Sequence, residues 1–402
     1  MVNTKKKSWQ IVYKYLIYLY LILFPFGQLL RMKVSIDSYV IRIQPIDLVV
    51  ATSAIIYIFG QLDENRVFRA FLGFLFAAAF SLTLSLTLFS SKQMLVGSLY
   101  LFRLFAYSTF FLLIVKSINK KLIRKRILIN CLIVVTLVIG VFGWVQYFAL
   151  PDVRFMRAFG WDDHYFRMVG TFFDPAFISI LFVFGLIISV VQFLKSKNVL
   201  YISAILFLLV SVLFTYSRAA YLALAVGIIV ILYIQRKLKL LFYFAVVFSF
   251  LILFLPRPSS EGVKLERIHS ILQKKDNYIE TLQIVKKHPV FGVGYNNLCS
   301  ARLRYVGDIG YGSHSCSGSD SSILLILSTT GIVGLLVFLS FIKSLYVQLK
   351  ESEYQVSFLA CSAALFTHSL FVNSLFYPWV LGYLAILFAV VFVSSEKPNL
   401  ST

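Results

Sequence analysis

Long apolar runs separated by short polar gaps dominate this sequence. Twelve mostly apolar segments are found at about 12–30, 45–62, 70–90, 94–115, 127–150, 176–194, 199–215, 219–235, 240–255, 321–342, 355–374 and 378–395. A bilayer-spanning helix needs about 20 such residues, whereas the strands of a membrane barrel would alternate apolar and polar positions. The pattern therefore predicts an all-α polytopic membrane protein with about twelve transmembrane helices.

The composition supports this class. Of 402 residues, 59% are hydrophobic and 14% are charged, whereas roughly 45–50% are apolar in an ordinary soluble domain. Twelve spans of about 20 residues would use about 240 positions, which is close to the hydrophobic fraction. These numbers exclude a soluble enzyme with a single core.

The charge is strongly positive, with 38 Lys and Arg against 17 Asp and Glu, a net +21. In a soluble protein this excess would suggest a nucleic-acid partner. Here the basic clusters fall in alternate gaps, beginning with Lys5, Lys6 and Lys7, as expected for cytoplasmic loops. We therefore predict cytoplasmic termini and no nucleic-acid partner. The first span is too long, and lacks a small-residue cleavage site, for a removed signal peptide.

Two of the outward gaps are long, at about 151–175 and 256–320. The chain is thus expected to consist of helices 1–9 with a loop at about 151–175 (1–255), a large outward loop (256–320) and helices 10–12 (321–402). The large loop holds nine Lys and Arg against six Asp and Glu, on the side where positive charge is normally sparse. An anionic ligand and a merely solvated loop both explain this excess.

An amphipathic helix is predicted in the large loop. Leu265, Ile268, Leu272, Ile279, Leu282 and Val285 recur at helical spacing, which is typical of a helix lying on the membrane surface. The helix should stop at His288, because the residue before a proline disfavours the helical conformation. Glycine- and serine-rich stretches at 291–295 and 310–319 follow, and such loops can fold over a substrate.

The sequence has few residues that indicate a cofactor. It has no HExxH, CxxC, P-loop or dinucleotide motif, and its five histidines are scattered. Neither a metal nor a nucleotide cofactor is therefore indicated. Cys299 and Cys316 share the large loop, where a disulfide and two free thiols are both open.

Arginines at the outer ends of the spans are candidate ligands for an anion. Arg167 precedes the sixth span, Arg218 follows a tight turn after the seventh, and Arg267 lies in the large loop. Each could extend to lipid head groups. Alternatively, the three guanidinium groups converge on one pyrophosphate through bidentate hydrogen bonds.

Carboxylates accompany these arginines. Asp174 is expected to cap the helix that begins with Pro175. Asp320 lies where the large loop re-enters the membrane, and there it serves either as a helix N-cap or as a general base. Arg103, His368 and Asn373 are polar groups at membrane depth, which mark a pathway or a polar packing contact.

Four motifs occur in order around the large loop. They are Arg167 with Gly170-Thr-Phe-Phe-Asp-Pro-Ala176; Ser217-Arg218-Ala219; Arg267 ahead of His288-Pro-Val-Phe-Gly-Val-Gly294; and Thr330-Gly-Ile-Val-Gly334. Together they resemble the O-antigen ligase and polymerase superfamily of bacterial polysaccharide assembly.

The resemblance implies about twelve spans in the bacterial inner membrane and a large periplasmic loop between spans nine and ten. It also implies transfer of a glycan from a polyprenyl pyrophosphate, in the bilayer, without metal or nucleotide. A chain-length regulator and a flippase of the same pathway become candidate partners.

One position departs from the family pattern. The ligases carry a histidine eleven residues before the first glycine of the Gly-Ile-Val-Gly element, where this chain has Asp320, and His314 lies six residues earlier. The departure favours a repeat-unit polymerase over a ligase that attaches finished glycan to lipid A core or protein. In this reading Arg167, Arg218 and Arg267 hold the pyrophosphate, and Asp320, with His314 in reserve, removes the hydroxyl proton with inversion at C1. A secondary transporter is the rival from another class.

Overall fold

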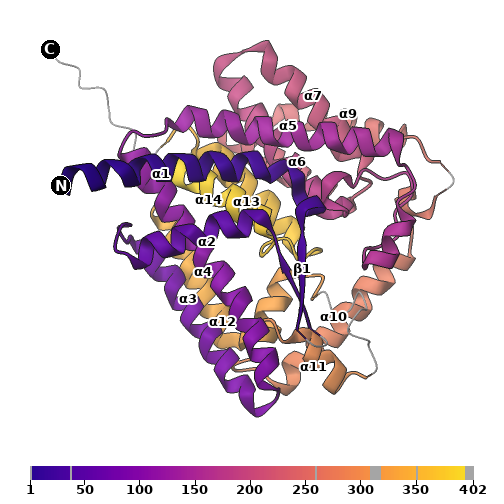
Figure 1. Ribbon diagram of the computed structural model, residues 1–402. Helices are drawn as coiled ribbons and strands as arrows, with labels where there is room; N and C mark the ends of the chain where they lie inside the picture. The colour runs from indigo at the N-terminus through magenta and orange to yellow at the C-terminus, as the bar shows by residue number, and fades with distance from the viewer. Residues whose placement is uncertain (1, 37–38, 259, 308–317, 350–351, 394–402) are drawn as a thin grey trace.

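The computed structural model describes residues 2–36, 39–258, 260–307, 318–349 and 352–393. Each of the twelve apolar segments contains one helix (Figure 1). These are α1 (Val2–Leu23), α2 (Pro45–Ile58), α3 (Arg66–Leu84), α4 (Ser91–Asn119), α5 (Lys125–Ala149), α6 (Pro175–Ser196), α7 (Val199–Phe214), α8 (Arg218–Ile234), α9 (Lys239–Leu253), α12 (Ser322–Val347), α13 (Gln355–Ser369) and α14 (Pro378–Phe392).

The helices fit a membrane protein, although they differ in length. Among the described residues, six helical segments are long and apolar enough to cross a bilayer: Trp9–Leu30, Arg66–Thr87, Ser91–Asn119, Lys125–Ala149, Pro175–Ser196 and Ser322–Val347. The other apolar segments form helices of 14 to 17 residues, which at 1.5 Å per residue reach at most about 25 Å of a core about 30 Å thick. The all-α membrane class is confirmed, and twelve complete crossings stay a prediction.

The core of the bundle surrounds α6 and α14. Small residues allow close helix contacts there, as in membrane bundles generally. Gly185 of α6 faces Thr136 of α5, and a Cβ at Gly185 would lie 2.2 Å from the Thr136 hydroxyl. Gly227 of α8 likewise packs against Ile187 of α6. These contacts fix the helices that carry the loops described below.

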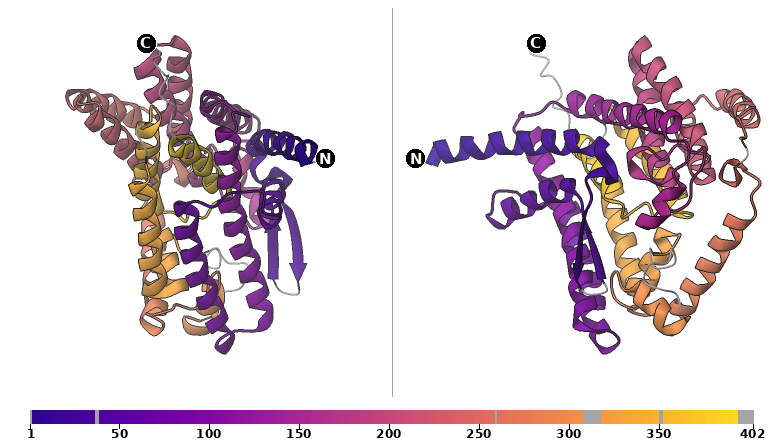
Figure 2. Two further views of the ribbon diagram at one scale, coloured as in Figure 1. Left: turned by 90° about the vertical axis from the view of Figure 1, so that its left-hand side faces the viewer. Right: turned by 45° about the vertical axis from the view of Figure 1, so that its right-hand side comes forward.

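A β-hairpin interrupts the helical pattern between α1 and α2. After the 3₁₀ segment η1 (Phe24–Leu30), strands β1 (Met32–Ile36) and β2 (Tyr39–Ile43) pair antiparallel, with Lys33 opposite Arg42 and Val34 opposite Ile41. The hairpin lies beside α4 (Figure 2). These strands were not predicted from the sequence. Alternation of apolar and polar residues over 32–36, Met-Lys-Val-Ser-Ile, was the available signal.

The large loop contains two helices, α10 (His269–Lys287) and α11 (Leu298–Tyr305), and the short 3₁₀ turn η5 (Glu261–Val263). The predicted amphipathic helix is α10, which ends at His288 as expected and runs obliquely to the bundle (Figure 2). Leu265 lies outside it, contrary to the predicted stripe. Ile268, just before the helix, and Leu272 and Ile279 within it expose 67%, 50% and 44% of their surface. This exposure is compatible with a membrane-facing side. The short helix α11 was not predicted.

The glycine motifs at 291–294 and 330–334 lie in backbone contact with each other. In α12, Gly331 adopts φ +67°, which breaks the helix, and the Val293 and Gly294 amides donate to the carbonyls of Ser328 and Thr329 at 3.0 Å. A Cβ at Gly331 would lie 2.1 Å from the Val290 carbonyl oxygen. Only glycine fits this contact, which anchors the end of α10 on α12.

Candidate functional site

One cavity of about 1570 Å³ opens where the loops meet the bundle. Its wall is built from the 154–176 loop, the α7–α8 turn, the large loop, the start of α12, the α13–α14 connection and parts of β2 and α4. Five residues singled out from the sequence line it together: Arg167, Asp174, Arg218, Arg267 and Asp320. The tertiary structure therefore gathers on one surface residues that are up to 153 positions apart in the chain (320 − 167).

The Tyr216 carbonyl is a common acceptor for two of the arginines. Tyr216 lies in the α7–α8 turn with φ +51°, a conformation uncommon for a residue with a side chain. Its carbonyl oxygen accepts from Arg167 Nη2 at 3.3 Å and from Arg267 Nη2 at 3.4 Å. Arg167 Nε also donates to the Thr215 carbonyl at 3.0 Å. The turn thus holds two guanidinium groups side by side.

Arg218 joins the same turn to the large loop. It is the first residue of α8, and its Nη1 donates to the carbonyls of Leu265 and Arg267 at 3.1 and 3.2 Å. Its Nη2 donates to the Ser270 hydroxyl at 2.7 Å. Because these acceptors lie directly before and within the first turn of α10, Arg218 positions Arg267 as well as contributing its own charge.

The electrostatics of this arginine cluster favour an anion. Burial and then the neighbouring Arg267 lower the pKa of Arg167 to about 9, against the opposing effect of Asp174. Burial, followed by the charge of Arg218, also lowers the pKa of Arg267. Each cation therefore destabilises its neighbour, and a multivalent anion would relieve this repulsion.

Gln146 of α5 orients the segment that carries Arg167. Its Oε1 accepts from the backbone amides of Val169 and Gly170 at 2.9 and 3.1 Å. The Met168 amide donates to the Phe214 carbonyl at 3.0 Å, which ties the same segment to the end of α7. These contacts hold Arg167 against the α7–α8 turn, and nothing in the local sequence indicated Gln146.

Asp174 caps α6, as predicted. Its Oδ1 accepts from the amides of Ala176 and Phe177 at 2.6 and 3.2 Å, and Pro175 occupies the first helical position. Burial raises the pKa of Asp174, and the nearby Asp162 raises it further. The carboxylate lines the cavity, but the capping bonds account for its presence.

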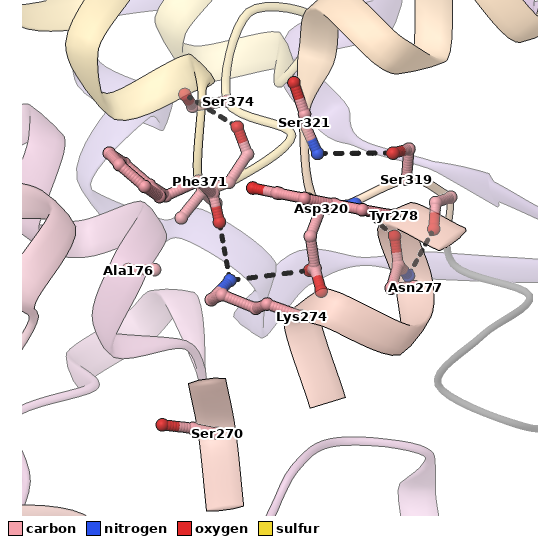
Figure 3. A network of polar contacts seen from close by, with 12 residues as sticks. Ala176, Ser270, Lys274, Asn277, Tyr278, Ser319, Asp320, Ser321, Phe371 and Ser374 are labelled. Atoms are coloured by element: carbon pink, nitrogen blue, oxygen red, sulfur yellow. Dashed lines mark hydrogen bonds and ion pairs between the residues drawn. The ribbon is translucent and has the colours of Figure 1, made fainter. Parts of the chain in front are cut away.

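Asp320 is not the cap of α12, which was one of the two roles that the sequence left open for it. The N-cap of α12 is Ser321, whose hydroxyl accepts from the Leu324 amide at 3.4 Å. The Asp320 carboxylate instead faces Lys274 of α10, with 3.7 Å between Oδ1 and Nζ (Figure 3). The Asp320 side chain is free of capping bonds to α12, which leaves it available to the cavity.

Asn277 and Arg302 hold the backbone beside Asp320. The Asp320 amide donates to Asn277 Oδ1 at 2.9 Å, and the fully buried Arg302 donates to the Asn277 and Gly318 carbonyls at 3.2 and 3.1 Å. Arg302 also approaches Glu280, at 3.5 Å. Sequence reasoning missed these residues and Lys274, because only the packing of α10, α11 and α12 brings them together.

The polar groups predicted at membrane depth have separate roles. Arg103 forms an ion pair with Asp47 at 2.8 Å. Arg103 and Asn373 both line the cavity. His368 is fully buried, with its Nδ1 3.0 Å from the Ser374 hydroxyl, and does not line the cavity. His368 is thus a packed polar residue next to the site.

Two aromatic residues whose rings could stack on sugar faces, Trp161 and Tyr295, line the cavity. Tyr305 instead contacts His288, whose Nε2 lies 2.9 Å from the tyrosine hydroxyl. Tyr311, His314 and Cys316 lie outside the described residues, so the reserve role of His314 remains a prediction. Cys299 is disulfide-bonded. Within the described ranges, no group of three or more His, Cys, Asp or Glu residues could hold a metal ion.

The fold and the site define a class: a polytopic helical membrane protein with a cationic cavity at the junction of its loops and bundle. Residues 203–339, about a third of the chain, match the family described as O-Antigen ligase. This match confirms the resemblance to the O-antigen ligase and polymerase superfamily, and it includes Arg218, Arg267 and Asp320. No curated protein matches the chain.

Proposed function

We propose that this protein is an inverting membrane glycosyltransferase that polymerises polyprenyl-pyrophosphate-linked oligosaccharide repeat units. The reaction takes place at the periplasmic face of the bacterial inner membrane, with both termini in the cytoplasm, and needs no metal. The observation that carries the proposal is the shared cavity: Arg167, Arg218, Arg267 and Asp320 all line it, within a family whose members act on such glycans.

The arginines supply the leaving-group stabilisation. The sugar C1 of the donor is bonded to an oxygen of the lipid diphosphate, and this bond breaks as negative charge develops on the diphosphate. Fixed guanidinium groups stabilise that charge without reorganising. Arg167 and Arg267 suit this role because the Tyr216 carbonyl holds them in place before the substrate arrives.

Asp320 supplies the base. An acceptor hydroxyl placed behind C1 loses its proton to the Asp320 carboxylate as its oxygen forms the new bond to C1. The Lys274 ammonium group lies 3.7 Å from this carboxylate. A single displacement of this kind inverts the configuration at C1.

Ligation of finished glycan to lipid A core or to a protein is the second candidate, because the matching family is described as O-Antigen ligase. The donor half of the chemistry is the same in both reactions. Polymerisation and ligation differ only in the acceptor, so an analysis of the products is needed to distinguish the two activities.

A deletion strain tests the proposal. Electrophoresis of its surface glycans should show single capped repeat units and no ladder, and the full-length gene should restore the ladder. Loss of all surface polymer with long lipid-linked chains retained would assign the ligase instead. An unchanged ladder would remove both activities.

A further inference from the structure

The hairpin between α1 and α2 carries a basic face. Lys33 and Arg42 are direct cross-strand partners, and directly opposed residues of an antiparallel pair lie on the same face. Arg31 precedes Lys33 by two residues in extended backbone, so it shares that face. The flanking pairs on either side, Met32 with Ile43 and Val34 with Ile41, are apolar and occupy the opposite face.

The three cations lack acidic partners. In the part of the chain that the structure describes, Arg31, Lys33 and Arg42 form no ion pair, while the nearby Asp47 is paired with Arg103 at 2.8 Å. Like charges opposite each other destabilise a hairpin. Partial burial and then the neighbouring cations lower the pKa of both Arg31 and Lys33. The cluster therefore disfavours its own folded arrangement unless an anion binds.

One residue of the basic face lines the cavity, and a second contacts a lining residue. Arg42 lines the cavity, and Arg31 stacks over the ring of Trp161, another lining residue, at 4.5 Å from the ring centre. Lys33 Nζ reaches the Phe159 carbonyl at 3.4 Å. The hairpin thus adds the cation Arg42 to the cavity wall and holds Arg31 and Lys33 against the 159–161 segment.

The size of the cavity is compatible with two ligands. Pockets for one small molecule are typically about 300–1,000 Å³, whereas this cavity measures about 1570 Å³. Carboxylates and further polar groups, including Asp162, Asp163 and His164, also line the cavity. Neutral sugars and their hydroxyl groups suit such a polar surface.

We propose that Arg31, Lys33 and Arg42 form a second anion subsite that binds the diphosphate of a second polyprenyl-linked glycan, the acceptor. The inference rests on the proposed polymerase function, because polymerisation joins two glycans that each carry a lipid diphosphate. The acceptor hydroxyl lies at the sugar end remote from its own diphosphate. Two anion sites separated by about one repeat unit are therefore what the reaction requires. In the transfer only the donor C1–oxygen bond breaks, and the acceptor diphosphate stays intact.

Binding stoichiometry tests the subsite. The full-length protein in detergent is titrated with geranylgeranyl diphosphate, and bound equivalents are counted by native mass spectrometry. We expect two equivalents for the unaltered protein. The double variant Lys33→Gln/Arg42→Gln should weaken one of them by about tenfold or more, because two charge-assisted contacts are lost. Arg218→Gln should weaken the other equivalent.

A matched control removes the same two residue types from an exposed turn. Arg236→Gln/Lys237→Gln lies between α8 and α9, away from the cavity, and should keep both equivalents. Arg42→Lys retains the charge, so the affinity for the second equivalent should stay within a few-fold of that of the unaltered protein. This variant distinguishes the loss of an anion contact from the loss of the hairpin fold.

Each remaining outcome overturns the subsite in a recognisable way. A single equivalent in the unaltered protein, unaffected by the hairpin variants but lost in Arg218→Gln, rejects the subsite and leaves the proposed function standing. Complete displacement of the hairpin-dependent equivalent by equimolar phosphatidylglycerol assigns the face to lipid head groups instead. Absence of any bound diphosphate rejects the subsite together with the proposed function.

Discussion

Arg167 and Arg267 donate to the same carbonyl oxygen, that of Tyr216, at 3.3 and 3.4 Å. They come from two different loops, 100 residues apart. A single backbone oxygen with partial negative charge offsets only part of the repulsion between two buried cations. A site of this kind is preorganised for an anion that carries more charge than a carbonyl.

Arg218→Ala should abolish glycan transfer while the protein still inserts into the membrane. The change removes one cation from the cavity and three hydrogen bonds that hold Leu265, Arg267 and Ser270 in place. We expect a loss of about 100-fold or more in transfer, measured as ladder formation in a complemented deletion strain. Arg236→Ala, on an exposed turn, is the control. Near-normal ladders from Arg218→Ala would remove this residue from the site.

Inorganic pyrophosphate should raise the thermal midpoint of the purified protein. A ligand that binds the folded state alone stabilises it by about 2.7 kcal/mol at 100 times its dissociation constant, and here it also relieves repulsion between Arg167 and Arg267. The shift should shrink in Arg167→Gln and persist in Arg236→Gln. Differential scanning fluorimetry in detergent measures it. Equal shifts in both variants would place the anion elsewhere.

Asp320→Asn should separate binding from chemistry. The amide keeps the shape of the side chain but cannot accept a proton from the acceptor hydroxyl, so transfer should fall by about 100-fold or more. Binding of geranylgeranyl diphosphate should stay within a few-fold, because the arginine cluster is intact. Lys274→Gln should have a smaller effect on transfer. Full activity of Asp320→Asn would exclude Asp320 as the base, and His314→Gln would then be the next variant.

Gly331→Ala should destabilise the protein strongly. The residue has φ +67°, and its Cβ would lie 2.1 Å from the Val290 carbonyl oxygen, so the contact between α12 and the end of α10 must open. We expect a cost on the order of 3 kcal/mol or more, seen as a lower thermal midpoint. Gly60→Ala is the matched control, since Gly60 has φ +68° and open space around its Cβ position. Similar losses in both variants would point to backbone strain alone.

The sequence alone determined the membrane class and the helical segments. The apolar character of a segment is a local property, so each of the twelve segments yields a helix, although α1 (Val2–Leu23) begins ten residues before its predicted segment. The Asp174 cap and the end of α10 at His288 also follow from neighbouring residues. The hairpin at 32–43 and helix α11 were missed, because both are short and their signals are weak beside those of the long apolar runs.

Only the tertiary structure decided which polar residues share the cavity. Arg167, Arg218 and Arg267 meet because the Tyr216 carbonyl and the start of α10 lie between them, a relationship that no local pattern contains. The same holds for the partner of Asp320, which is Lys274 of α10, while Ser321 takes the cap. Local propensity depends on residues within a few positions of each other, whereas a binding site depends on distances set by the packing of the whole chain.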